Sequence, residues 1–574
     1  MRLGESKYAD LGTIFTKETA IMRNSYRQII YLTLTIALLL PALVLGQSNG
    51  NLPNINVTQY RLKNGLQVVL HQDKSTPIIA VNVFYHVGSK NETPGRTGFA
   101  HLFEHMMFQG SKNYSSDYLS AIDDMGGSVN GTTDEDRTWY FETVPSNFLE
   151  RTLYLEADRM GNLLEAMTQD KLDNQRDVVK NERRLRVDNQ PYGTSFERIG
   201  ETMYPEGHPY HWSVIGSMAD LSAASMEDVK SFFRTYYVPN NATLVLAGDF
   251  DENQAKAWIE KYFGPLAKGD DIKRPNDPQP KLNSEIRKTY EDAVPFPRLS
   301  MVWHGSPQFS ADEAALDTLA SILSSGRGSR LQSNLNYGKE LVSQIFASNP
   351  TNEIGGLFQI TATARPGKTL EEIEKEIDQE IERIKKQPPT AEEMQRALNG
   401  RESQFIYGLE SVSGKGAQLS SYAGYLGKPS YFQTDLDRYR KVTPADVQRV
   451  ADQYLTVNRL VMSYVPSKAP ASRPSPAADK PASGKAAELD KDSIARQKAM
   501  LPKAGPTIKF ALPSIEKHKL SNGLNVWFVR NPELPIVSMN LVFNSGSILD
   551  SNEKYGVASW TASMLNQGTS SRSA

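Results

Sequence analysis

An internal repeat constrains the fold of this 574-residue chain more than any other feature. Residues 519–568 align without gaps on residues 61–110 at a constant offset of 458 (519 − 61). Both copies hold an Asn-Gly pair, followed at matching positions by Pro-Ile, Gly-Ser and Met-x-x-Gln-Gly. Since a chance match would not keep a hairpin, a strand and a helix in register together, the sequence predicts a repeated domain.

The first copy belongs to a unit in which strand-like and helix-like segments alternate. Asn64-Gly65, between two alternating runs, is a hairpin signal, and the β-branched segment 77–87 predicts a strand. Apolar periodicity predicts helices near 98–109, 145–167 and 170–188. A second unit again mixes strands with charged amphipathic helices. The order predicts an α+β fold of repeated two-layer αβ domains, in which helices cover mostly antiparallel sheets.

Composition sets the boundaries between the predicted units. Residues 467–513 are rich in Pro, Ala, Ser and Lys and cannot bury enough apolar surface to pack, so we expect an extended, solvated linker. This linker separates a first αβ domain at 55–270 and a second at 285–466 from the second copy at 514–574. That copy stops soon after its first helix, and we expect the chain to be truncated within this third domain.

Residues 1–46 are expected to be an N-terminal extension that ends in a secretory signal peptide. Residues 29–46 form a nearly unbroken apolar run after Arg23 and Arg27, and the signal is expected to start at Met22. The alternative is an uncleaved membrane anchor, because the 18 residues of the run are the lower limit for a spanning helix. The sequence thus predicts an exported protein, in the periplasm of a Gram-negative bacterium or anchored in the membrane and facing the periplasm.

The composition narrows the chemistry that is open to the chain. It has no cysteine, which excludes disulfide scaffolds, thiolate zinc sites and thiol catalysis. Lys and Arg number 64 against 66 Asp and Glu, so bulk charge gives no reason to expect a nucleic-acid partner. Any metal must therefore be held by His, Asp or Glu, and the chain has only eight His.

Two of these histidines form the strongest chemical motif, His101-Leu-Phe-Glu-His105. On a helix, His101 and His105 lie one turn apart on one face, and Glu104 lies on the same arc. Two imidazoles and a carboxylate that converge suit a catalytic zinc, with two ligands and a base beside them. The alternative is that all three are half-buried polar residues of an ordinary helix.

The repeat supplies an internal control for this motif. Ser559, Ala562 and Ser563 take the places of the two histidines and the glutamate in the second copy, while the apolar frame around them is kept. The fold therefore does not require His or Glu at these positions. A chemical role explains the triplet of the first copy better than a structural role does.

A second amphipathic helix carries Glu182, with 76 residues between it and His105. With this residue the chain resembles the pitrilysin-type, or insulinase-like, zinc peptidases (M16), whose H-x-x-E-H motif is followed by a Glu at about this distance. The resemblance implies Zn²⁺ as cofactor, with His101, His105 and Glu182 as its ligands and Glu104 as general base. It also implies a clam-shell of repeated domains, one half active and the other degenerate, that closes around a peptide.

Two further segments resemble the same family. Residues 130–133, Asn-Gly-Thr-Thr, resemble the family's Asn-Ala-x-Thr edge strand, with Gly131 in place of Ala. The resemblance implies that this edge pairs with an extended substrate, and that Asn130 and Thr133 contact it. Residues 326–331, with the sequence Gly-Arg-Gly-Ser-Arg-Leu, resemble a turn of the family.

Two other observations bear on the ligand set. Gln175 stands where many members of the family carry a Glu seven residues before the third ligand, and a Glu there could tune the site from outside the ligand set. His208 and His211 are alternative ligands, but Pro209 between them disfavours their presentation on a helix.

The sequence therefore predicts a zinc metalloendopeptidase that hydrolyses short or unfolded peptides by direct attack of water. No nucleophile motif such as G-x-S-x-G accompanies the site, so we expect no covalent acyl-enzyme. One alternative is a non-catalytic scaffold member of the same fold. Another is a fragment that is inactive without a C-terminal half or a partner subunit to close the chamber.

Overall fold

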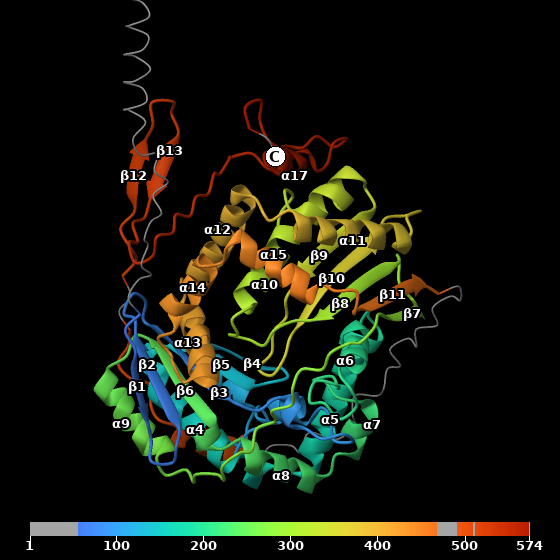
Figure 1. The fold of residues 1–574 in the computed structure, drawn as a ribbon. Helices are drawn as coiled ribbons and strands as arrows, with labels where there is room; N and C mark the ends of the chain where they lie inside the picture. Colours follow the sequence, from blue (N-terminus) through green and yellow to red (C-terminus); the bar gives the residue numbers. More distant parts are fainter. Residues whose placement is uncertain (1–54, 468–490, 509–510, 573–574) are drawn as a thin grey trace, which may run out of the picture. The chain divides into compact units, whose positions relative to one another are not determined.

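The computed structural model describes residues 55–467, 491–508 and 511–572 (Figure 1). The expected extension and signal peptide, residues 1–46, lie outside the described residues, and so does 468–490, the first part of the Pro-rich stretch. Among the helices that are described, none is both long and apolar enough to cross a membrane.

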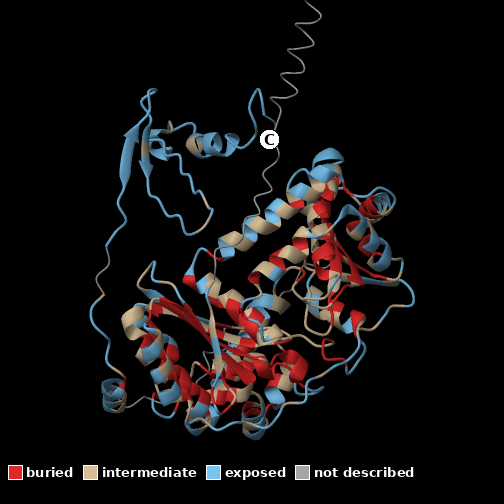
Figure 2. Ribbon diagram, turned by 60° about the vertical axis from the view of Figure 1, so that its left-hand side comes forward, coloured by how far each residue is buried: buried red, intermediate tan, exposed pale blue. Residues whose placement is uncertain are grey.

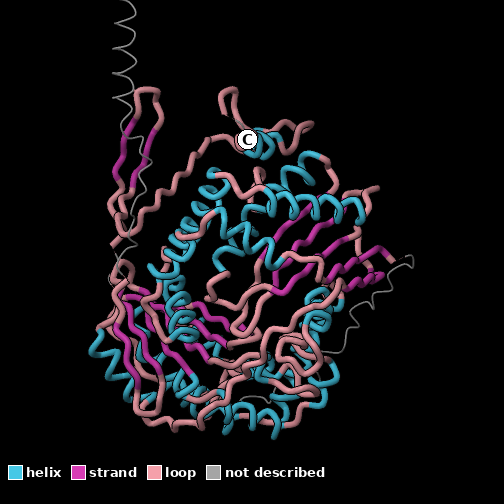
Figure 3. The backbone as a smooth tube through the Cα atoms, in the orientation of Figure 1, coloured by secondary structure: helices cyan, strands magenta, loops and turns pink. Residues whose placement is uncertain are grey.

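A six-stranded sheet is the framework of the first unit (Figure 3). Its strands lie in the order β1-β2-β6-β3-β5-β4, and every neighbouring pair is antiparallel except β2 with β6. Their bounds are β1 Thr58–Arg61, β2 Gln67–Gln72, β3 Ile78–Tyr85, β4 Ser128–Thr133, β5 Thr138–Pro145 and β6 Ala242–Gly248. β4 is thus an edge strand, as the sequence predicted for residues 130–133.

Helices cover one face of this sheet because their apolar sides match its buried side chains. The helices of this part are α2 Phe99–Met106, α3 Tyr118–Asp123, α4 Leu149–Ala166, α5 Gln169–Arg183, α6 Ser195–Met203, α7 Met218–Ala223, α8 Met226–Tyr236 and α9 Glu252–Phe263. One core cluster joins alternate residues of the strands, such as Val81 and Val83 on β3, to Leu102 and Phe103 on α2, all fully buried. This core fixes α2 against the sheet.

A five-stranded sheet forms the second unit, in the order β7-β11-β8-β10-β9, with β7 and β11 as its one parallel pair. Its strands are β7 Ile286–Asp292, β8 Arg298–His304, β9 Val342–Ser348, β10 Leu357–Ala364 and β11 Leu460–Pro466. The helices are α10 Glu313–Ser324, α11 Leu370–Lys386, α12 Ala391–Gly408, α13 Val412–Leu426, α14 Phe432–Arg440 and α15 Pro444–Tyr454. Mostly antiparallel sheets with helices confirm the predicted fold class.

Helix α13 packs against the first sheet although it belongs to the second unit in the chain (Figure 1). Its Gly424 is so close to β3 that an added Cβ would lie 2.4 Å from Cε1 of Phe84, and Gly416 lies in the same way against Asn82. Since Phe84 and Asn82 alternate with the residues that face α2, β3 is buried on both faces.

The last part of the stretch predicted to be an extended linker is instead folded. Residues Lys491–Met500 form helix α16, and Leu501 after it is 8% exposed and joins the core of the first unit. Oε1 of Gln497 accepts hydrogen bonds from both the N–H and the hydroxyl of Ser115, each at 2.9 Å. A buried leucine and a paired amide explain why this part does not stay extended.

The second copy of the repeat reproduces the hairpin and the helix of the first, but its residues 536–543, which match β3, form no strand. It contains β12 Glu516–Lys519 and β13 Asn525–Phe528, joined as an antiparallel hairpin, and then α17 Val557–Met564. Asn522 Oδ1 accepts the N–H of Leu524 at 3.1 Å, as Asn64 Oδ1 accepts that of Leu66 at 3.2 Å. The predicted hairpin and helix of the second copy are therefore confirmed, and almost all of this copy is exposed (Figure 2).

Candidate metal centre

Helix α2 presents the H-x-x-E-H motif because its other side is anchored in the core. Gly98 precedes it with a φ of +87°, a conformation that glycine adopts without strain. The carboxylate of Glu92 then accepts the N–H groups of Gly98 and Ala100 at 2.9 and 2.8 Å, which pairs two of the free donors at the helix start. Burial raises the pKa of Glu92 to about 8, against the opposing effect of these N–H groups.

Helix α5 supplies the carboxylate. Thr168 caps its start, and the buried Leu172, Gln175 and Val179 face the core. Glu182 follows Val179 by three residues and so lies on nearly the same side of the helix, one turn further along. The helix then continues as a π-helical turn over Arg184–Asp188, and Arg186 on that turn pairs with Oε1 of Glu182 at 2.7 Å.

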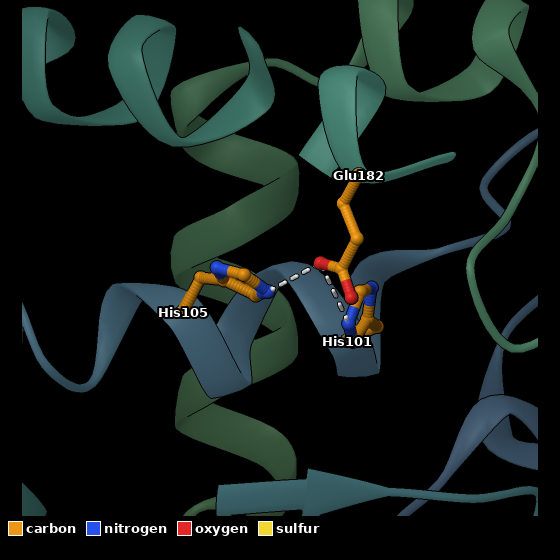
Figure 4. Close-up of side chains that lie close together, drawn as sticks. All are labelled: His101, His105 and Glu182. Carbon is orange, nitrogen blue, oxygen red and sulfur yellow. Dashed lines mark ion pairs between the residues drawn. The ribbon is translucent and has the colours of Figure 1, made fainter. Parts of the chain in front are cut away.

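The two helices bring three side chains to one point (Figure 4). Oε2 of Glu182 lies 3.6 Å from Nε2 of His101 and 3.2 Å from Nε2 of His105. All three ligand atoms lie within 4.8 Å of one another, and the side chains are 12%, 22% and 16% exposed for His101, His105 and Glu182. The residues predicted as ligands are therefore the ones that the structure brings together.

This donor set fits a zinc ion. Tetrahedral zinc with bonds of about 2.0–2.2 Å places its N and O ligands about 3.3 Å apart, close to the two Nε2–Oε2 distances. Burial, with a further effect of His105, lowers the pKa of His101 to about 4, so its imidazole is neutral, as metal binding requires. The interaction with His105 lowers the pKa of Glu182 and keeps its carboxyl ionised.

Glu104 lies next to this group and is held by the edge strand. The hydroxyl of Thr133 donates a hydrogen bond of 2.7 Å to Oε2 of Glu104. Burial raises the pKa of Glu104, and the bond from Thr133 opposes that rise. Gly131 lies against the same side chain, since a Cβ added there would be 2.9 Å from Cγ of Glu104. The predicted base is thus held by β4 and interacts electrostatically with His105 and Glu182.

The two residues predicted to contact substrate are already engaged within the chain. Thr133 contacts Glu104, and Oδ1 of Asn130 accepts the N–H of Gly131 at 2.9 Å. Their contacts with a peptide stay a prediction.

The alternative histidine ligands are used elsewhere. His208 stacks on Tyr204 with ring centroids 4.7 Å apart, and its Nδ1 accepts the N–H of Tyr210. Nδ1 of His211 lies 2.8 Å from the carbonyl oxygen of Tyr204. Within the described ranges, His101, His105 and Glu182 are the one group of three side chains that could hold a metal. Neither His208 nor His211 belongs to it.

Sequence reasoning missed three contacts that shape the site. The first is Glu92, whose signal was available because the repeat has an acidic residue, Asp550, at the matching position. The second is Arg186, four residues after Glu182, which is the spacing of a helical ion pair. The third is the bond from Thr133 to Glu104, for which the sequence gives no local signal because it depends on how β4 lies against α2.

Two known family descriptions match the chain, and one of them covers this site. The family described as "Insulinase (Peptidase family M16)" matches residues 67–210, which contain the three candidate ligands and Glu104. The family described as "Peptidase M16 inactive domain" matches residues 223–401.

Individual relatives agree with the family match. The zinc protease PqqE of Helicobacter pylori is 33% identical over 401 residues, 68% of this chain and 89% of that protein. The probable mitochondrial-processing peptidase subunit beta of Arabidopsis thaliana is 24% identical over 429 residues, 72% of this chain and 78% of that protein. The crystal structure of a protease from Helicobacter pylori aligns with a TM-score of 0.67 at 31% identity and covers 72% of this chain and 100% of that one. The chain therefore belongs to the insulinase family of M16 peptidases.

Proposed function

We propose that this protein is a zinc-dependent endopeptidase that hydrolyses short or unfolded peptides. The observation that carries the proposal is the convergence of His101, His105 and Glu182 on one point, with Glu104 beside them. Family membership and a relative named as a zinc protease support it.

The proposed ligands and the proposed base have separate roles. His101, His105 and Glu182 would hold the zinc ion. When bound, zinc supplies Lewis-acid polarisation of the scissile carbonyl and makes water more acidic. Glu104 takes a proton from the attacking water and later delivers it to the leaving amine, since its carboxylate lies beside the ligands and carries no ion-pair partner in the described part of the chain.

The edge strand β4 is the proposed binding surface for the peptide. A strand at the edge of a sheet offers unpaired N–H and C=O groups, which bind an extended peptide of almost any sequence through its backbone. A folded substrate has no free extended segment to offer, and this favours short or unfolded peptides.

The test is the substitution Glu104→Gln in the full chain loaded with zinc. We expect zinc content to stay at the wild-type value, while hydrolysis of a mixed peptide pool falls by a factor on the order of 10² to 10⁴, the usual contribution of a general base. Glu165→Gln, a change at an exposed carboxylate at the end of α4, is the matched control and should leave both values unchanged.

Two outcomes would contradict the proposal. Turnover retained in zinc-loaded Glu104→Gln would remove Glu104 as base. A zinc-loaded wild-type chain that cleaves no peptide would favour the non-catalytic member of the fold, or a need for further αβ units in the same or a partner chain.

Export through a signal peptide that starts at Met22 is a separate proposal, supported by the apolar run at 29–46. N-terminal sequencing of the exported protein tests it. A mature start shortly after Gly46 is expected, and a start upstream of Met22 would contradict it.

A further inference from the structure

The two oxygens of the Glu104 carboxylate have different surroundings. Oε2 accepts the hydroxyl proton of Thr133 at 2.7 Å, and among the described residues this is the hydrogen bond that the side chain of Glu104 makes. Oε1 faces the space beside Gly131, where an added Cβ would lie 3.3 Å from it. One oxygen is therefore fixed and the other is left available.

The register of β4 shows which backbone groups point out from the sheet. At the turn, the N–H of Asp134 donates to the carbonyl of Arg137 at 3.0 Å, and Thr133 is paired with Thr138 in the next, non-hydrogen-bonded position. Because hydrogen-bonded and non-bonded pairs alternate in antiparallel strands, the N–H and C=O groups of Gly131 and Thr133 point away from β5. The bond from the Gly131 N–H to the side chain of Asn130 agrees with this assignment.

Thr133 therefore has two roles at one position. Its backbone lies on the open edge, and its side chain lies on the face of the strand that contacts Glu104. Thr132, the neighbouring residue, differs in both respects, since its hydroxyl and its carbonyl bind the guanidinium of Arg137. The side chains of residues 132 and 133 point to opposite faces of the strand.

We propose that Thr133 is a positioning residue that orients the base through its hydroxyl, an inference that rests on the proposed function. By holding Oε2, the hydroxyl leaves Oε1 of Glu104 directed at the attacking water. Because the backbone of Thr133 belongs to the edge that pairs with the peptide, the same residue sets the base relative to the bound substrate. Thr133 thus acts through Glu104 and need not touch the substrate with its side chain.

The alternative is that the hydroxyl only stabilises the strand. A carboxylate without its hydrogen-bond donor turns about its broad terminal torsion, so loss of the hydroxyl should cost part of the contribution of a general base. Valine keeps the β-branched shape of threonine and its preference for strands. The comparison of Val with Ser at position 133 therefore separates the hydroxyl from the shape of the side chain.

The experiment uses Thr133→Val, Thr133→Ser and, as the matched control, Thr289→Val at an exposed threonine of strand β7 in the second sheet, all in the zinc-loaded full chain. We expect Thr133→Val to lower kcat by about 10- to 100-fold, a part of the usual contribution of a base, with KM and zinc content unchanged. Thr133→Ser should restore most of kcat, and Thr289→Val should leave kcat unchanged. Wild-type kcat in Thr133→Val, or a Ser variant as slow as the Val variant, would overturn the inference.

A second measurement does not depend on activity. Crystal structures of the zinc-loaded wild type and of Thr133→Val should show one ordered carboxylate orientation for Glu104 in the former and a rotated or divided one in the latter. An unmoved carboxylate in Thr133→Val would overturn the positioning role even if the protein proves to be inactive. An inactive wild type in which this carboxylate does depend on Thr133 would contradict the proposed function alone.

Discussion

The two copies of the repeat share the conformation of their hairpin turn and of their helix start, and they differ in their chemistry. The turn glycines Gly65 and Gly523 have φ angles of +92° and +89°, and the glycines before the two helices, Gly98 and Gly556, have +87° and +94°. Each pair is separated by the same 458 positions as the aligned sequences. The local conformation therefore follows from the turn residues themselves, whatever surrounds them.

The carboxylate at the helix start is also repeated. Glu92 accepts two backbone N–H groups at the start of α2, and Asp550 accepts the two equivalent groups of α17 at 2.9 and 3.0 Å. The shorter side chain of Asp550 accepts the same pair of backbone N–H groups as the side chain of Glu92. This acidic residue belongs to the fold of the repeat, since the second copy keeps it and carries no metal ligands.

The two copies also differ in how far their helices are buried. Five residues of α2 are buried, whereas α17 buries none within the described residues. The two histidines and Glu104 are replaced by Ser559, Ala562 and Ser563. Caps and turns therefore specify the local backbone of the repeat. The buried core and the residues of the metal site differ between the copies while that local backbone stays the same.

The strongest test of this independence transfers the residues of the second copy into the first, as His101→Ser, Glu104→Ala and His105→Ser together. We expect zinc binding to be lost and peptide hydrolysis to fall by a factor on the order of 10³ or more, because two ligands and the base are removed. The melting temperature of the metal-free protein should change by only a few degrees, since α17 forms with these residues. Zinc content, hydrolysis and thermal unfolding measure the three expectations, and an unfolded triple variant would contradict the independence of site and fold.

The second test concerns Glu182, the candidate ligand on α5, which lies outside the repeated segment. Glu182→Gln should weaken zinc binding by a factor on the order of 10² or more, because the charged ligand is lost. Asp177→Asn, at a more exposed carboxylate on the same helix, is the matched control and should leave zinc affinity unchanged. Zinc titration against a competing chelator measures both variants. Unchanged affinity in Glu182→Gln would place the third ligand elsewhere.

Features that are specified by residues close together in the chain could be predicted from the sequence. The spacing of His101 and His105 gives their relation directly, because residues four apart on a helix share a face. The hairpin at Asn64-Gly65 was predictable for the same reason, because it is specified by residues that lie close together in the chain, whereas the edge position of residues 130–133 came from the family resemblance. The convergence of Glu182 with the histidines came from the family resemblance, since no local pattern relates two helices.

Contacts between distant segments could not be predicted in this way. The bond from Thr133 to Glu104 depends on the register of β4 and on the packing of α2, which the whole core sets. Helix α16 was missed because composition averages over a stretch, whereas Leu501 docks as a single residue. In both cases a local pattern specifies the helix or strand, and tertiary packing determines which residues it contacts.

A smaller effect is expected from alanine at the two turn glycines. In either copy, Ala at a positive φ costs about 1–2 kcal/mol of strain. At Gly65 the new Cβ would also lie 2.7 Å from Cβ of Asn240, which adds about 1–3 kcal/mol of overpacking, whereas at Gly523 nothing lies within 4 Å. Gly65→Ala should therefore lower the melting temperature of the first unit, and Gly523→Ala should change only hydrogen exchange in its own hairpin. Equal losses of global stability would show that the second copy is packed more firmly than its exposure indicates.

The smallest effect is expected at the repeated carboxylate. Above pH 8, where the Glu92 carboxyl is ionised, Glu92→Gln keeps the volume of the side chain but replaces one acceptor by a donor, so one buried N–H of α2 loses its partner at a cost of about 1–3 kcal/mol. The same change in the second copy, Asp550→Asn, leaves an N–H that water can reach, because α17 is exposed. Denaturant unfolding should show the loss for Glu92→Gln alone, and hydrogen exchange at Gly98 and Ala100 should quicken. If Asp550→Asn lowered global stability as much as Glu92→Gln, the second copy would have to be part of the same cooperative unit as the first, and the independence inferred from its burial would fail.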